Sequence, residues 1–230
     1  MFASVVVPTY NEAGSLPLLI PRLAAALGGR EWELVIVDDR SPDGTADIAE
    51  RFGATQPVRV VRRAGKLGLA SAVLAGFAAA RGDTLVVMDA DLSHPPEVVP
   101  QLLDALAGGA DMAIGSRYVT GGGAMDWPMS RRVVSRVACL MGNVLVPVRD
   151  STSGFFAVRR TVVDGVTLNP IGFKIGFEVM ARGRYKKVVE VPYVFRDREL
   201  GKSKFGRREI GQYLIQLGQV GRDKAMGRLR

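Results

Sequence analysis

The sequence predicts a single α/β domain with a mostly parallel central sheet flanked by helices. Short β-branched runs alternate with longer stretches of helical periodicity, which is typical of parallel strands joined by helical crossovers. The chain has 230 residues, of which 47% are hydrophobic, so it can bury one sizeable core without further division. Each early strand also ends in polar or turn residues, and ligands of α/β sheets gather at such strand ends.

The predicted elements alternate along the first half of the chain. Strands are expected at 4–7, 34–37, 58–61, 85–88 and 111–114. The helices expected between and after them span 16–27, 45–52, 69–80 and 97–106. The first of these helices is amphipathic, because apolar residues recur at helical spacing at Leu16, Leu19, Ile20, Leu23 and Leu27.

The pattern is looser in the second half. A glycine run at 121–123 predicts a flexible loop; helices are expected at 133–145 and 173–182, and strands at 152–158 and 188–194. The last segment, 207–220, places Ile210, Tyr213, Leu214 and Leu217 on one helical face. Two interpretations of that helix stay open: an ordinary packing helix, or a helix lying at a membrane interface.

Composition limits the classes of partner and compartment. A formal charge of +8 favours an anionic partner, and residues 196–230 carry ten Lys or Arg against four Asp or Glu. Nucleic acid is disfavoured, because these basic residues are not interleaved with stacking aromatics. We expect neither a signal peptide nor a spanning helix. Cys139 is the only cysteine, which excludes a disulfide framework and favours a reducing cytoplasm.

The most informative stretch is 85–96, where an apolar run ends in two carboxylates one residue apart, Asp89 and Asp91. Two oxygen ligands without a partnering His or Cys suit a hard divalent cation that also holds a diphosphate. The alternative is a solvated acidic turn. The loops after the first two strands favour the metal site, because they lie on the same edge of the predicted sheet.

Those two loops, 8–12 and 38–45, carry the groups that a nucleotide needs. Tyr10 can pack on a base, and Glu12 and Asp39 can accept hydrogen bonds from base or ribose. Other residues of these loops have simpler interpretations, since Asp-Gly at 43–44 is a turn signal and Thr45 can cap the following helix.

A series of motifs runs through residues 3–205, in the order VVVPTYNE, VDDRSPDGT, GLASAVLAGF, GDTLVVMDADLSHPPE, GSRY, SRRVVSRVA, DSTSGF and EVPYVFRDRELGKSK. In these motifs the chain resembles family 2 glycosyltransferases, and most closely their polyprenyl-phosphate (dolichyl-phosphate) mannose synthase branch. This resemblance implies a GT-A fold and an inverting transfer from a nucleotide sugar to a polyprenyl phosphate. In these terms 1–206 would be the catalytic domain and 207–230 a basic amphipathic helix.

The resemblance also implies roles for single residues. The nucleotide sugar would be bound by Pro8, Tyr10, Glu12, Asp39, Lys66, Asp89, Ala90, Asp91, Arg117 and Lys202. Mg²⁺ or Mn²⁺ would be held by Asp89 and Asp91, with Ser93 assisting directly or through water. Arg117, Arg131 and Ser135 would bind the acceptor phosphate, and the reaction would depend on Asp89, Asp91, Arg117 and Arg131. Lys202 and Lys204 lie in a loop expected to cover the donor.

No catalytic base is expected, because a phosphate acceptor is already anionic at neutral pH. Asp150 is the alternative base, although we favour a structural role for it. The chain departs from relatives at Phe156, where Arg is usual, at Arg40, where a small residue is more common, and at Cys139, where Asn is common. His94 is expected to hydrogen-bond within its loop rather than to bind metal.

These observations favour transfer of mannose from GDP-mannose to a polyprenyl phosphate at the cytoplasmic face of a membrane, by a peripheral enzyme. A transferase that uses UDP-glucose or another nucleotide sugar is the closest alternative. A nucleotidyltransferase is disfavoured, because no glycine-rich loop with an adjacent Arg follows the first strand. A non-catalytic nucleotide- or lipid-binding partner of a membrane complex, or a separate membrane subunit that holds this domain, also stays open.

Overall fold

The computed structural model describes residues 1–125, 127–197 and 207–229, and the side chains from residue 209 onward in the last of these ranges. Its main sheet has seven strands in the order β3 (Val58–Arg62), β2 (Trp32–Asp38), β1 (Ala3–Thr9), β4 (Thr84–Val87), β7 (Phe156–Arg159), β5 (Met112–Ser116) and β8 (Val188–Pro192). Two short strands, β6 (Gly123–Ala124) and β9 (Val194–Phe195), pair separately. The predicted α/β fold with a mostly parallel sheet is confirmed.

Buried strands form the centre of the sheet. Residues 5–7 of β1 and 34–37 of β2 are apolar and fully buried, as expected of parallel strands covered on both faces. Their register pairs Val5 with Leu34 on one side and with Val86 of β4 on the other.

One strand, β7, runs against its neighbours. It is antiparallel to both β4 and β5, and its first residue, Phe156, pairs with Val87 and Ile114. The amino-terminal end of β7 therefore lies beside the carboxyl ends of the parallel strands. This direction brings the 150–155 loop to the edge that carries Asp89 and Arg117.

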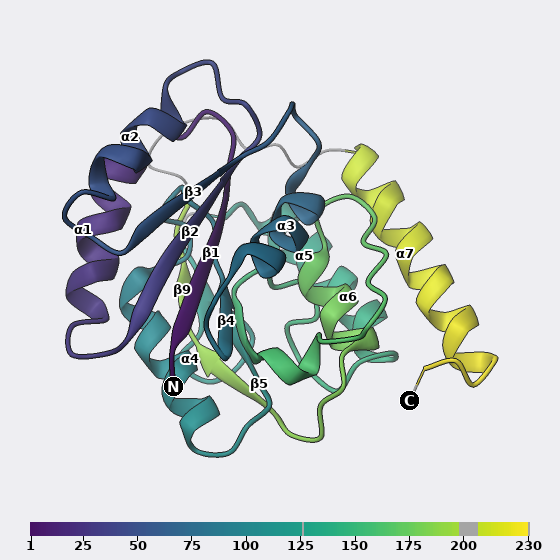
Figure 1. The fold of residues 1–230 in the computed structure, drawn as a ribbon. Helices are drawn as coiled ribbons and strands as arrows, with labels where there is room; N and C mark the ends of the chain where they lie inside the picture. Colours follow the sequence, from purple (N-terminus) through teal and green to yellow (C-terminus); the bar gives the residue numbers. More distant parts are fainter. Residues whose placement is uncertain (126, 198–206, 230) are drawn as a thin grey trace.

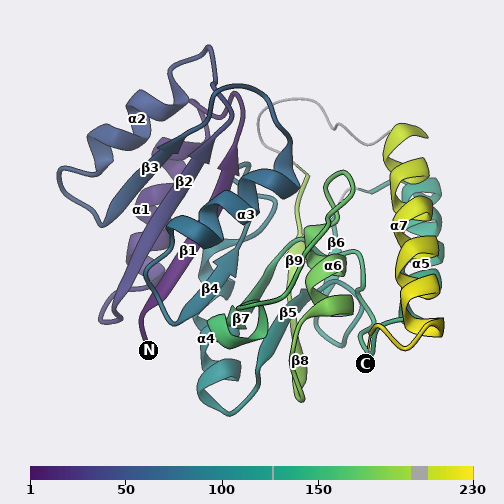
Figure 2. The same cartoon turned by 45° about the vertical axis from the view of Figure 1, so that its right-hand side comes forward.

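Helices cover both faces of the sheet (Figure 1). On one face α1 (Leu16–Ala26), α2 (Thr45–Phe52) and α4 (Val99–Ala107) pack on alternate strand residues such as Val5, Val7 and Ile36. On the other face α3 (Leu69–Ala79) packs on the intervening residues of β1 and β2, such as Val6 and Val35, and α6 (Ile175–Arg182) and α7 (Arg207–Ala225) contribute to the same buried cluster. Helix α5 (Met129–Asn143) lies beside α7 (Figure 2).

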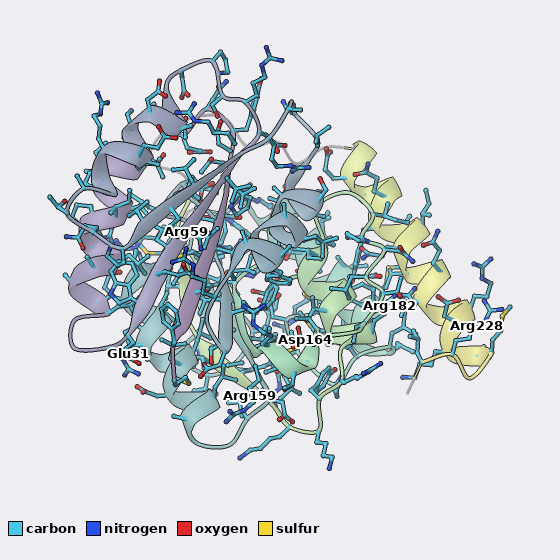
Figure 3. The ribbon with its side chains drawn as sticks, viewed as in Figure 1. Glu31, Arg59, Arg159, Asp164, Arg182 and Arg228 are labelled. Carbon is cyan, nitrogen blue, oxygen red and sulfur yellow. The ribbon has the colours of Figure 1, made fainter. Side chains whose placement is uncertain are left out.

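Helix α7 is held to the body of the domain by partly buried polar contacts. Arg182 of α6 donates to Asp223 of α7 at 2.7 Å and to Glu178 at 2.6 Å, and Figure 3 shows Arg182 beside α7. The Tyr213 hydroxyl donates to the Ala138 carbonyl of α5 at 3.0 Å. This approach depends on Gly142, since a Cβ there would lie 2.6 Å from the Tyr213 oxygen. One face of α7 is therefore a packing face.

Several predicted boundaries are corrected. The strand expected at 152–158 is confined to 156–159, because residues 151–155 form a loop in which the Ser153 hydroxyl accepts the Phe155 backbone N–H and the Thr152 hydroxyl accepts from Arg117. The strand expected at 188–194 is divided into β8 and β9 at Tyr193, whose amide donates to the Ser116 carbonyl. Helix α5 begins at Met129, four residues before the prediction, and α7 extends to Ala225.

Candidate active site

The loops that follow β1, β2 and β4 lie together at one edge of the sheet, and their backbone is strained. Asn11, Arg40 and Leu92 have positive φ angles of 61°, 57° and 64°, one in each loop. A side chain in this conformation costs about 1–2 kcal/mol, and such strain gathers at functional sites. The backbone conformation therefore indicates a functional site at this edge of the sheet.

Asp39 is buried and organises the loop that follows β3. Its Oδ2 accepts the backbone N–H groups of Leu67 and Gly68 at 2.9 and 2.8 Å, and its Oδ1 accepts from Arg63 at 2.7 Å. Three donors leave the carboxylate roughly one favourable acceptor position. Asp39 thus fixes the backbone next to Lys66, and it can accept few further hydrogen bonds from a ligand.

Tyr10, Lys66 and Glu12 line the same region. The Lys66 ammonium lies 4.0 Å from the centroid of the Tyr10 ring, a cation–π distance. Glu12 Oε2 accepts from the Ser15 hydroxyl, and its backbone N–H donates to Thr45 Oγ1 at 2.9 Å. Thr45 joins the loops after β1 and β2 in this way, instead of capping α2 as expected; the cap position is Gly44.

The predicted metal ligands follow β4, and Pro8 stands near the end of the adjacent β1. The Asp89 side chain is one-third exposed, whereas Asp91 is buried and its Oδ1 accepts the backbone N–H of Ser93 at 3.1 Å. Ala90 and Ser93 are also buried.

His94 stabilises the loop that carries Asp89 and Asp91. Its Nδ1 accepts the Asp89 backbone N–H at 3.0 Å, and its ring stacks on Phe155 at 4.9 Å. Burial lowers the pKa of His94 against the opposing effect of Asp89, so the ring is neutral at pH 7. The predicted hydrogen-bonding role is confirmed, and the Nδ1 lone pair is not available to a metal.

The donor set at Asp89 and Asp91 suits Mg²⁺ or Mn²⁺. Both predicted ligands are carboxylates, and the described residues contain no group of three or more His, Cys, Asp or Glu side chains that would complete a protein-only metal site. Mg²⁺ in particular is commonly bound by one or two carboxylates together with substrate phosphates and waters. The residues present fit that arrangement.

A buried ion pair lies next to these carboxylates. Arg117 donates from Nε and Nη2 to the two oxygens of Asp150 at 2.8 and 2.7 Å, and from its backbone N–H at 2.9 Å. Burial alone would raise the pKa of Asp150, but the charge and hydrogen bonds of Arg117 hold that pKa below its usual range. The carboxylate is therefore an anchor for Arg117 and a poor proton acceptor.

Lys174, which the sequence did not single out, joins this cluster. Its Nζ donates to the Thr152 carbonyl at 3.0 Å, and the Thr152 hydroxyl accepts from Arg117 at 2.8 Å. Burial, reinforced by Arg117, lowers the pKa of Lys174 to about 8. The Lys174 ammonium is thus held beside the Arg117–Asp150 pair, and the carboxylates of Asp150 and Asp89 both oppose the fall of its pKa. The only sequence signal for Lys174 is its place in a mostly apolar stretch, 173–180, where a helix is predicted to begin.

The residues expected to bind the acceptor phosphate gather around Trp127. The Arg117 and Arg131 guanidinium carbons lie 5.3 and 4.2 Å from the centroid of its ring. Arg131 also donates to Asp197 at 2.7 Å, and Ser135, one helical turn further along α5, accepts from the Tyr118 hydroxyl at 2.7 Å. The structure thus brings Arg117, Arg131 and Ser135 to one place.

The structure also places Phe156 and Cys139, two residues at which the sequence departs from its relatives. Phe156 is fully buried in the core at the start of β7, so an apolar side chain suits this position here. Cys139 is buried against Asp150 and Thr152. Lys202 and Lys204 lie outside the described residues.

Comparison with known proteins identifies relatives across most of the chain. Residues 4–167 match the family described as Glycosyl transferase family 2. A dolichol-phosphate mannosyltransferase of Pyrococcus furiosus is 50% identical over 93% of this chain, which spans 62% of that relative's length. A polyprenol monophosphomannose synthase of Mycolicibacterium smegmatis is 40% identical, with 98% of this chain and 91% of the relative covered. A dolichol-phosphate mannosyltransferase of Saccharomyces cerevisiae is 39% identical, with 94% and 86% covered.

Solved structures share the fold at lower identity. Glucosyl-3-phosphoglycerate synthase from Mycobacterium tuberculosis, in complex with Mn²⁺, UDP and glucosyl-3-phosphoglycerate, is 22% identical with a TM-score of 0.68 over 95% of this chain and 78% of that one. The same enzyme with Mg²⁺ and UDP is 23% identical with a TM-score of 0.69, over 95% and 77%. The family match, the relatives and this fold agree: the chain is a GT-A glycosyltransferase and belongs to glycosyl transferase family 2.

Proposed function

We propose that this chain transfers mannose from GDP-mannose to a polyprenyl phosphate, with Mg²⁺ or Mn²⁺ as cofactor. The observation that carries the proposal is a cationic site that stands beside an exposed apolar helix. Arg117 and Arg131 meet at Trp127, and the helix that carries Arg131 presents an apolar face to solvent. A phosphate joined to a hydrocarbon chain needs both features. Relatives of 39–50% identity, named dolichol-phosphate mannosyltransferase or polyprenol monophosphomannose synthase, support the sugar and the acceptor of this proposal.

The apolar face of α5 continues toward the end of the helix. Its charged residues, Arg131, Arg132 and Arg136, all lie at or before the midpoint of the helix. Large hydrophobic side chains are exposed at 40–79% of their surface on Met129, Val133, Val134, Val137, Leu140, Met141 and Val144. Helix α7, beside it in Figure 2, exposes Ile210, Leu214 and Ile215. Together these exposed side chains of α5 and α7 form an apolar patch, and a contiguous patch of many large hydrophobic side chains indicates an interaction surface.

We propose that this patch lies on the cytoplasmic face of a membrane. None of the described helices is both long and apolar enough to cross a bilayer. An interfacial helix requires an apolar face together with basic residues, and α5 has both. Docking there would present the lipid phosphate to Arg131 and Ser135 without removing the tail from the bilayer. A separate membrane subunit that covers the same patch is the alternative that the liposome experiment below distinguishes.

The metal would be held by Asp89 and Asp91, with Ser93 assisting. When bound, it would offset the charge of the donor diphosphate and of the departing nucleoside diphosphate. The side chains of the protein would bind the rest of the donor. Tyr10, Glu12, Asp39 and Lys66 would hold the nucleotide on the loops after β1, β2 and β3.

No side chain is needed to remove a proton, because the attacking phosphate oxygen is already anionic. Asp150, the alternative base, is paired with Arg117 and its pKa is lowered, which supports a structural role. Catalysis would then rest on alignment and charge. Arg117, Arg131 and Lys174 supply positive charge around two phosphate groups, and the buried indole N–H of Trp127 has no acceptor among the residues that the structure describes.

The proposed function predicts that purified protein with Mn²⁺ forms a mannosyl lipid from GDP-mannose and a polyprenyl phosphate, and no glucosyl lipid from UDP-glucose. Asp91→Ala should abolish this turnover and metal-dependent nucleotide binding, because one of two metal ligands is lost. Labelled donors, lipid extraction and calorimetric titration of GDP with and without Mn²⁺ measure both effects.

Asp164→Ala is the matched control. Asp164 is exposed and follows β7 at the opposite edge of the sheet; it is labelled in Figure 3. This variant should retain turnover, and both variants should unfold at the same temperature as the parent. Glucosyl transfer from UDP-glucose would contradict the proposed donor, and full turnover by metal-depleted Asp91→Ala would contradict the metal site.

Arg131→Ala should weaken the binding of the lipid phosphate far more than the binding of the donor nucleotide sugar. Loss of one charged hydrogen-bond partner costs about 1.5–3 kcal/mol, or roughly ten- to 150-fold in affinity. Separate titrations of donor and acceptor provide the test. Arg132→Ala is the control, since Arg132 donates only to the carbonyls of Trp127 and Ala124 among the described residues. Equal losses for both ligands would assign Arg131 to the donor site or to the scaffold.

Replacing the exposed Leu140 of α5 and the exposed Val144 directly after that helix, Leu140→Ser with Val144→Ser, should weaken binding to anionic liposomes. Each apolar side chain withdrawn from the interface forfeits up to about 1.5–3 kcal/mol, so we expect a loss of roughly ten-fold or more. The apparent KM for a long-chain acceptor should rise, while that for a short water-soluble acceptor stays unchanged. Sedimentation with liposomes over a salt series measures the binding.

The control is Leu18→Ser, an equally simple change at an exposed leucine of α1, on the other face of the sheet. It should leave liposome binding and both KM values unchanged. If the parent protein fails to bind liposomes at every salt concentration, the patch is covered by a protein subunit instead of lipid.

A further inference from the structure

A pocket of about 380 Å³ opens at the carboxyl ends of β2 and β3. It is lined by Asp38, Arg40, Ser41, Arg62, Arg63 and Ala64. Asp39 and Lys66, which we propose to surround the nucleotide, flank this lining in sequence. The pocket therefore adjoins the base end of the proposed donor site.

The three arginines of the pocket differ in how their charge is compensated. Arg62 is paired with Asp47 and Glu50 of α2, and Arg63 with Asp39. The Arg40 guanidinium donates from Nη1 to the Ala64 carbonyl at 3.3 Å, and none of the described carboxylates forms an ion pair with it. Arg40 is also exposed. Its remaining N–H groups are thus available to a ligand in the pocket.

The backbone holds Arg40 in an unfavourable conformation. Its φ of 57° is one that residues other than glycine rarely adopt. The flanking residues enforce it: Ser41 donates its backbone N–H and its hydroxyl to the two oxygens of Asp38, at 2.8 and 2.5 Å. Strain of this kind persists only where the surroundings fix it. Here it places an exposed arginine in the lining of the pocket.

The chemistry of the bases decides what such an arginine can read. Guanine presents two adjacent acceptors, O6 and N7, which match the two parallel N–H donors of a guanidinium. Uracil presents a single acceptor, O4, on the corresponding edge. Asp39 contributes little to the choice, because three donors already occupy it and it can accept from a uracil N3–H or a guanine N1–H alike.

We propose that Arg40 binds the O6 and N7 atoms of the donor guanine and so selects GDP over UDP. This inference rests on the proposed function and adds to it the residue that determines nucleotide specificity. It assigns the choice of base to a side chain of the loop after β2, apart from the carboxylates that we propose hold the metal.

The test is nucleotide binding by the parent protein, Arg40→Ala and Arg62→Ala, each titrated with GDP, 7-deaza-GDP and UDP in the presence of Mn²⁺. Arg40→Ala should bind GDP about five- to 150-fold more weakly, the range for one bidentate arginine–guanine pair, and UDP unchanged. The parent should bind 7-deaza-GDP, which lacks the N7 acceptor, more weakly than GDP. That difference should vanish in Arg40→Ala.

Arg62→Ala is the control, because Arg62 lines the same pocket but has its charge compensated; it should keep the parent's preference. Thermal unfolding of all three proteins excludes a general loss of structure. Equal losses of GDP and UDP affinity in Arg40→Ala, or an unchanged penalty for 7-deaza-GDP, would overturn the inference while mannosyl transfer from GDP-mannose persists. A parent protein that prefers UDP would instead overturn the proposed donor.

Discussion

The buried ion pair between Arg117 and Asp150 is the contact on which the rest of the site depends. It joins the end of β5 to the loop before β7, and Glu190 of β8 accepts the backbone N–H groups of Arg149 and Asp150 at 2.8 and 3.0 Å. Removing one partner of such a pair typically costs about 3–5 kcal/mol, because the other charge is left buried. Three parts of the sheet edge are therefore held in one arrangement, with Arg117 next to Trp127, where we place the acceptor phosphate.

The direction of β7 makes this pair possible. Because β7 is antiparallel to β4 and β5, its preceding loop shares an edge with the carboxyl ends of both strands. Asp89 and Arg117 then both act electrostatically on Lys174, although the three residues are far apart in sequence. The apolar face of α5 begins at this edge and connects the charged site to the surface that we propose meets the membrane.

Much of the fold could be predicted because parallel strands buried on both faces are continuous apolar runs that stop where they reach solvent. The same pattern located Asp89, Asp91 and Asp39 on one edge. The extent and direction of β7 could not be predicted, since hydrophobic periodicity does not distinguish parallel from antiparallel pairing. Lys174 was missed because its role comes from packing against the 151–155 loop. The strain at Arg40 is likewise set by its neighbour Asp38, and no local sequence signal reports it.

The central claim is that Asp150 serves the reaction only by holding Arg117. A double-mutant cycle on kcat/KM tests it most directly, with Arg117→Met, Asp150→Leu and the double variant, each first shown to be folded by thermal unfolding. If Asp150 acts only through Arg117, the double variant will be no slower than Arg117→Met alone. If the two losses multiply, Asp150 has an independent role, such as accepting a proton, and the account of a reaction without a base is wrong.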